Sequence, residues 1–196
     1  FVNIVGNPNV GKSTLMNQLV GERISIATFK AQTTRHRIMG IVNTDDMQIV
    51  FSDTPGVLKP NYKLQESMLA FSESALQDAD VLLYVTDVVE NPEKNMDFLE
   101  KVQKMTIPVL LLINKIDELS SDSRESSQSR LNAIVEKWHT LLPNAEILPI
   151  SAKNKFGVDM LLKRIQELLP ESPAYFDKDQ LTDKPARLFV SEIIRE

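Results

Sequence analysis

The sequence contains no cysteine in its 196 residues. It therefore forms no disulfides or thiolate metal sites, which is typical of proteins in a reducing compartment. It also lacks an apolar run near the roughly 20 residues that a membrane-spanning helix needs. The densest runs, residues 81–83 and 109–113, have the length of buried strands. We therefore expect no transmembrane segment and a cytoplasmic location.

Positive charge is scarce: the sequence has 22 Lys and Arg but 27 Asp and Glu, which gives a net charge of −5. Binding nucleic acid over the whole surface needs clustered basic residues, so any polyanion site must be local. The hydrophobic content of 42% is close to the average for globular proteins. The length allows one full domain and a fragment of another.

Short apolar runs alternate with patterns of helical period. Strands are expected over residues 1–5, 38–43, 47–52, 81–86, 109–113 and 147–150, and helices over residues 12–20, 63–77, 92–104, 129–142 and 158–169. This alternation predicts an α/β fold, with a mostly parallel six-stranded sheet covered by helices on both faces. No helical pattern separates residues 38–43 from 47–52, so this pair predicts a hairpin with one antiparallel strand.

Two polar stretches interrupt this order. The Ser-rich residues 120–129 predict a mobile surface loop. Near Pro170 the pattern stops, which predicts a main domain over residues 1–170 and a linker over residues 171–184. Residues 185–196 carry an unpaired apolar face, Phe189, Val190, Ile193 and Ile194, expected to begin a further domain. The alternative is a tail helix that docks on the main domain.

Residues 6–13 fit the pattern G-x-x-x-x-G-K-[ST] between an expected strand and an expected helix, which is the context that a phosphate-binding loop requires. Its glycines let backbone N–H groups face the phosphates of a nucleotide. Lys12 would reach the β- and γ-phosphates, and the Ser13 hydroxyl would bind Mg²⁺. Asp53 and Gly56, in Asp-Thr-Pro-Gly, would hold Mg²⁺ through water and meet the γ-phosphate. Alone, that tetrapeptide is also ordinary turn chemistry.

A base-reading segment follows the most apolar expected strand. In Asn114-Lys115-Ile116-Asp117, the Asp117 carboxylate can accept from the N1–H and N2–H₂ groups of guanine, whereas adenine offers no matching donors. This predicts GTP rather than ATP. Ser151-Ala152-Lys153 follows the last expected strand, where the Ala152 N–H could donate to guanine O6.

Residues 30–37 have no apolar period and predict a moving loop, with a threonine that completes the Mg²⁺ shell. The alternative is a solvated basic loop, since Lys30, Arg35 and Arg37 cluster positive charge there. His36 and His139 have no metal-ligand spacing and are expected at the surface.

In order, GNPNVGKS, TTR, DTPG, NKID and SAK resemble the motifs of the translation-factor-related P-loop GTPases, in particular the Era-like family. KAQTTRHR and DQLTDKPARLFVSEIIRE also resemble that family's switch loop and its junction into an RNA-binding KH domain. The resemblance implies a GTP hydrolase with Mg²⁺ that acts in small ribosomal subunit maturation. Its implied partners are GTP, GDP, small-subunit rRNA and the 30S subunit, bound through a KH domain that this sequence lacks. Peripheral association with the inner face of the membrane is a further expectation.

The resemblance also implies roles for individual residues. The phosphates would lie against Asn9, Val10, Gly11, Lys12, Ser13 and Thr14, and the base against Asn114, Lys115, Asp117, Ser151, Ala152 and Lys153. The implied catalytic residues are Lys12, Thr34 and Gly56, and the implied Mg²⁺ ligands are Ser13 and Thr34, with Asp53 in the outer shell. Thr34 is chosen over Thr33 because it lies beside the arginine. Val57 occupies the position of the catalytic glutamine of better-known GTPases. Asn9 resembles an asparagine that can hold K⁺ near the phosphates in some relatives.

Three alternatives are weighed against this interpretation. The chain could be a nucleotide-gated binding module in which hydrolysis is incidental. It could be a related tRNA-modification or ribosome-assembly GTPase with the same motifs. An ATP-dependent kinase is disfavoured by NKID.

Overall fold

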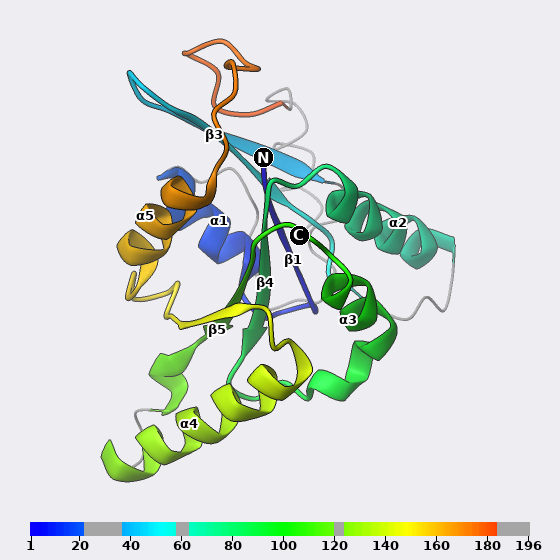
Figure 1. The fold of residues 1–196 in the computed structure, drawn as a ribbon, viewed down its shortest axis with the longest axis vertical. Coiled ribbons are helices and arrows are strands. Elements are labelled where there is room, and N and C mark those ends of the chain that lie inside the picture. Colours follow the sequence, from blue (N-terminus) through cyan, green and yellow to red (C-terminus); the bar gives the residue numbers. More distant parts are fainter. Residues whose placement is uncertain (22–36, 58–62, 120–123, 184–196) are drawn as a thin grey trace, which may run out of the picture.

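A six-stranded sheet forms the centre of the computed structural model, which describes residues 1–21, 37–57, 63–119 and 124–183 (Figure 1). The strand order is β2-β3-β1-β4-β5-β6. The strands are β1 (Val2–Gly6), β2 (Ile38–Asn43), β3 (Gln48–Asp53), β4 (Val81–Asp87), β5 (Val109–Asn114) and β6 (Glu146–Pro149). The hairpin partners β2 and β3 are antiparallel and all other neighbours are parallel. The predicted fold class is confirmed.

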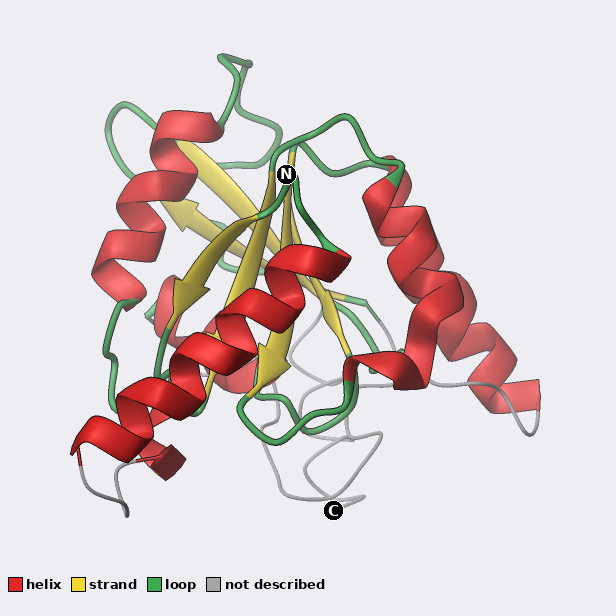
Figure 2. Ribbon diagram, turned by 60° about the horizontal axis from the view of Figure 1, so that its bottom comes forward, coloured by secondary structure: helices red, strands yellow, loops and turns green. Residues whose placement is uncertain are grey.

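The helices cover both faces of this sheet (Figure 2). They are α1 (Lys12–Val20), α2 (Lys63–Gln77), α3 (Met96–Gln103), α4 (Arg124–Leu141) and α5 (Val158–Leu168), with short 3₁₀ turns η1 (Pro92–Asn95) and η2 (Ile116–Leu119). One core cluster joins α1 and α5 to the sheet, and a second joins α2, α3 and α4 to the opposite face. Strands β1 and β4 are buried along their whole length, because helices lie on both sides of them.

The expected loop over residues 120–129 is wrong from residue 124 onward, where α4 begins. Residues 125–130 are exposed or half-buried in this helix, so they show no apolar period. Helical propagation from the buried Trp138 end, with a Gln128–Asn132 hydrogen bond of 3.0 Å, accounts for this extension. The helix expected over residues 92–104 is divided into η1 and α3.

Residues 173–183 run along the edge strand β2. The Ile41 N–H donates to Leu181 O at 2.8 Å, and Gly40 forms an antiparallel bridge with Thr182. On β3, the Gln48 side chain accepts from the N–H groups of Tyr175 and Phe176. The predicted linker therefore covers one edge of the sheet. Residues 184–196, including the expected apolar helix face, lie outside the described residues.

None of the helices in the described ranges is long and apolar enough to cross a membrane. The strand order reverses direction at β1, which lies between β3 and β4. In open α/β sheets, ligands bind beyond the carboxyl ends of the strands at such a point. The loops after β1, β3, β5 and β6 therefore define the place to look for the site.

Candidate functional site

The loop between β1 and α1 turns tightly through backbone conformations that L side chains rarely adopt. Asn9 has φ 65° and Gly11 has φ 97°, both in the left-handed region. A Cβ on Gly11 would also collide with the Asn114 side-chain amide. Glycine is therefore required at position 11 by both backbone conformation and space. The result is a compact loop at the N-terminus of α1, which is a favourable place for phosphate groups.

Lys12 is buried at the base of this loop. Its Nζ donates to Gly6 O at 3.1 Å and to Asn7 O at 2.8 Å. Burial lowers the pKa of Lys12 to about 8, although the negative charges of Asp53 and Glu90 act in the opposite direction. Lys12 therefore places a partly desolvated cation beside the backbone that would wrap the phosphates.

Ser13 and Asp53 meet at the carboxyl end of β3, where the Ser13 hydroxyl lies 2.7 Å from Asp53 Oδ2. Asp53 is fully buried. A hydroxyl beside a buried carboxylate would suit Mg²⁺, which Ser13 would contact directly and Asp53 would hold through a bound water. Within the described ranges, no group of three or more His, Asp or Glu side chains could hold a metal. Mg²⁺ at this place would therefore take most of its ligands from phosphate oxygens and water.

The segment after β3 lies directly against the phosphate loop. The Thr54 hydroxyl donates to Ile4 O at 2.8 Å, and the Val57 N–H donates to Gly6 O at 3.0 Å. A Cβ on Gly56 would lie 2.7 Å from Pro8 Cγ, so only glycine fits there without a shift. Val57 is buried in the core cluster beneath α2 and α3. Its side chain therefore has neither the chemistry nor the place to orient a water molecule.

Asn114 joins the phosphate loop to the base-reading loops. Its Nδ2 donates to Val10 O at 2.8 Å, and its Oδ1 accepts from the Ala152 N–H at 2.9 Å. The sequence predicted that this N–H donates to guanine O6. In the structure the N–H already faces Asn114, so guanine would have to share it, and the predicted contact stays a prediction.

The side chains of Asp117 and Lys115 both contact residues of neighbouring segments. The Ser151 hydroxyl donates to Asp117 Oδ1 at 2.6 Å, which turns the carboxylate toward the loop after β6. Lys115 has φ 62°, and its Nζ lies 2.7 Å from the buried Asp87 carboxylate. Ser151 therefore positions the predicted base reader, a role that the three-residue motif alone did not indicate.

The remaining predicted residues fall into three groups: exposed, buried, or outside the described residues. Lys153 is exposed at the rim, and His139 is exposed on α4 as expected. Thr34, Thr33 and His36 lie outside the described residues. Arg37, expected in a free basic cluster, instead has a largely buried side chain whose guanidinium contacts Asp78, Ser52 and Asn3. The pKa of Asp78 is lowered although burial opposes this, because the Arg37 guanidinium stabilises the carboxylate.

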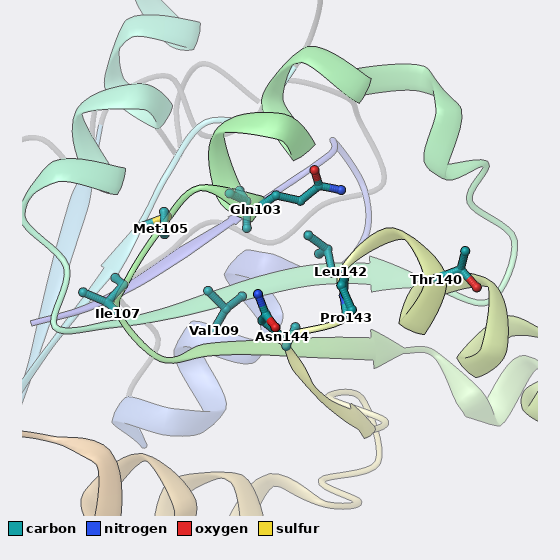
Figure 3. Close-up of a pocket in the computed structure, with 10 residues that line it drawn as sticks. Gln103, Met105, Ile107, Val109, Thr140, Leu142, Pro143 and Asn144 are labelled. Atoms are coloured by element: carbon teal, nitrogen blue, oxygen red, sulfur yellow. The ribbon is translucent and has the colours of Figure 1, made fainter.

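A cavity of about 340 Å³ lies at the opposite end of the sheet (Figure 3). It is lined by Val102, Gln103, Met105, Ile107, Val109, Thr140, Leu142, Pro143, Asn144 and Ala145. Val109 begins β5, whereas Asn114 ends it. None of the lining residues is charged, so this cavity does not suit a nucleoside triphosphate.

The strand order, the phosphate loop and the base-reading loop define the G domain of a P-loop GTPase. The chain belongs to the 50S ribosome-binding GTPase family, whose model matches residues 1–115.

Individual relatives agree with this family. The chain is 43% identical over 196 residues to GTPase Era of Lactobacillus helveticus, covering 100% of this chain and 63% of that protein. A crystal structure of Era with MgGDPNP and nucleotides 1506–1542 of 16S ribosomal RNA has a TM-score of 0.88 at 39% identity, covering 100% of this chain and 65% of that one. A crystal structure of an Aquifex aeolicus Era variant bound to GDP·AlF₄⁻ has a TM-score of 0.87 at 38% identity, covering 99% and 64%. The chain therefore spans somewhat less than two thirds of the length of these relatives.

Proposed function

We propose that this chain is the GTP-binding and GTP-hydrolysing part of a switch protein that acts on the small ribosomal subunit. The bridge made by Asn114 carries the nucleotide-binding part of this proposal. This single side chain joins Val10 of the phosphate loop to Ala152, one residue after the serine that holds Asp117. Phosphate and guanine recognition are thereby tied together on one rim of the sheet.

The chain's own groups account for binding. The backbone N–H groups of residues 9–14 would surround the phosphates, and Lys12 would place its positive charge against the β- and γ-phosphates. Asp117 would accept from guanine N1–H and N2–H₂, while the Ser151 hydroxyl holds Asp117 Oδ1 in place. Ser13 would hold Mg²⁺ directly and Asp53 would hold it through water, and the ion would offset the negative charge that develops on the phosphates.

Hydrolysis needs a further group to place water, because Val57 is apolar and buried. Gly56 N–H and Thr34 are the proposed contacts to the γ-phosphate and Mg²⁺. We hypothesise that a K⁺ ion beside Asn9 adds positive charge that stabilises the transition state. The resemblance of the loop to K⁺-dependent relatives motivates this hypothesis. Turnover at the same rate in K⁺ and in Na⁺ would remove it.

The proposed RNA partner is small-subunit rRNA, bound chiefly through a KH domain that begins near residue 185 after the linker at 171–184. A relative's structure that contains nucleotides 1506–1542 of 16S ribosomal RNA supports this choice. The family description instead mentions the 50S subunit, which is the second candidate. The proposed location is the cytoplasm, and peripheral membrane association stays a prediction from the sequence.

The test has two parts. Titration with fluorescent GDP, GTP and ATP should show tight, Mg²⁺-dependent binding of the guanine nucleotides alone, and equal affinity for ATP would contradict the assignment. GTP turnover by the complete protein is then measured with purified 30S and 50S subunits. Stimulation by 30S alone supports the small-subunit proposal, and stimulation by 50S alone replaces it. No stimulation by either subunit would favour a binding module in which hydrolysis is incidental.

A further inference from the structure

Three polar residues outside the predicted contact set connect the phosphate loop to the segment after β3. They are Asn7, the second residue of the phosphate loop, Glu90 in the turn after β4, and Asn95 at the end of η1. Asn7 and Asn95 are buried, and Glu90 is partly buried. Buried polar side chains are retained where their hydrogen bonds are satisfied, so their partners show what they hold in place.

The Asn95 side-chain amide uses both of its N–H groups. It donates to Asn7 Oδ1 and, at 3.0 Å, to Val57 O. One amide therefore joins the start of the phosphate loop to the residue that follows Gly56.

Glu90 fixes the other end of the Asn7 side chain. Its Oε1 accepts from Asn7 Nδ2, and its Oε2 accepts from the Thr86 hydroxyl at 2.6 Å. Thr86 belongs to β4 and is fully buried. Both polar ends of Asn7 are thereby engaged, and the chain of contacts ends on a rigid central strand.

This network surrounds the contact between Pro8 and Gly56. Asn7 precedes Pro8 and Val57 follows Gly56, so Asn95 bridges the residues that flank the contact. The Val57 N–H adds a bond of 3.0 Å to Gly6 O. Gly56 is therefore fixed relative to the phosphate loop by bonds on its C-terminal side and by packing on Pro8.

We propose that Asn95 and Glu90 are positioning residues for GTP hydrolysis, which set the place of Gly56 relative to the phosphate loop through Asn7 and Val57. The inference rests on the proposed function, in which the Gly56 N–H meets the γ-phosphate. The α- and β-phosphates and the base would contact other residues, in the loops at 9–14, 114–117 and 151–153. Loss of the network should therefore lower turnover more than it lowers GDP affinity.

The experiment compares substitutions at the two positions. Asn95→Ala removes both donors, and Asn95→Asp keeps the shape but presents carboxylate oxygens to two acceptors. Glu90→Ala removes both acceptors. Glu90→Gln keeps an oxygen that accepts from Asn7 Nδ2, and the Thr86 hydroxyl can rotate to accept from the new amide N–H. Asn91→Ala is the matched control, because among the described residues this exposed side chain accepts only from the Glu93 N–H, at the start of η1.

Single-turnover GTP hydrolysis, GDP affinity and thermal unfolding are measured for each variant. Since displacement of a reacting group by about 1 Å can cost about 100-fold, hydrolysis should fall about 10- to 100-fold in Asn95→Ala, Asn95→Asp and Glu90→Ala. Glu90→Gln should restore most of the rate, and GDP affinity should stay within about threefold throughout. Asn91→Ala should hydrolyse GTP at the unsubstituted rate.

Wild-type hydrolysis rates in the Asn95 and Glu90→Ala variants would overturn the inference, as would a loss of GDP affinity as large as the loss of rate. If Asn95→Ala does not fold, the comparison of Glu90→Ala with Glu90→Gln decides. Failure of the unsubstituted chain to bind guanine nucleotide is a different result, which refutes the proposed function itself.

Discussion

Substitution of Asn114 by alanine should separate the two halves of the nucleotide site. The amide is buried, with Nδ2 2.8 Å from Val10 O and Oδ1 2.9 Å from the Ala152 N–H. Val10 and Ala152 are themselves buried, so water has poor access to the groups left behind. Both backbone groups would lose their partner at once.

The cost follows from those two unpaired groups. A buried donor or acceptor left without a partner costs about 1–3 kcal/mol, so the pair gives about 2–6 kcal/mol. Water that enters the small space vacated by the amide would move the value toward the lower end. We expect a loss of about 3 kcal/mol in the free energy of unfolding, against a typical total of about 5–15 kcal/mol. The variant should therefore fold, with reduced stability.

The assay is urea unfolding followed by circular dichroism, together with titration of fluorescent GDP. GDP affinity should fall at least about tenfold, which is about 1.4 kcal/mol, because the phosphate and base loops are no longer joined. The control is Asn132→Ala on α4, where an exposed asparagine accepts a hydrogen bond from Gln128 and has no other side-chain bond within the described part of the chain. A loss below about 1 kcal/mol with unchanged GDP affinity would refute the bridging role.

Three further predictions address other parts of the site. Asp117→Asn should shift preference from GTP toward xanthosine triphosphate, because an amide suits a 2-oxo group; a nucleotide competition assay tests this, and unchanged preference contradicts the base-reading role. Arg37→Ala should destabilise the fold by about 2–4 kcal/mol in urea unfolding, because buried polar partners lose their donor. Asp78→Asn, at a half-exposed position, should cost less, and equal losses would contradict this order. Gly56→Ala should slow single-turnover hydrolysis more than it weakens GDP binding, because the added Cβ meets Pro8; wild-type turnover would show that this contact is not needed.

The sheet and the phosphate loop could be predicted from the sequence because their signals are local. Strands β4 and β5 are continuous apolar runs, and the loop at residues 6–13 stands between a strand and a helix in the expected way. The start of α4 could not be predicted, since its first turns are polar and face solvent. A helix without a buried face has no apolar period to recognise.

The supporting polar contacts could not be predicted from the sequence either. Asn7 and Asn95 are 88 positions apart, and Arg37 and Asp78 are 41 positions apart. Nothing in the local pattern distinguishes these side chains from solvated ones, because their partners are brought together by the sheet. Arg37 shows the consequence, since a residue expected in a free basic loop lies instead across the sheet toward the end of α2.

Asn114 and Asn95 bond to different residues of the phosphate loop. Asn114 joins Val10 to the base-reading side, whereas Asn95 joins Asn7 to the segment after Gly56, and in the described ranges the two amides share no hydrogen-bond partner. Effects of substitutions without shared partners usually add within about 0.5 kcal/mol. The double alanine variant should therefore combine the weak GDP binding of one single variant with the slow hydrolysis of the other. A coupling energy above about 1 kcal/mol in single-turnover hydrolysis would show instead that the phosphate loop responds as one unit to both amides.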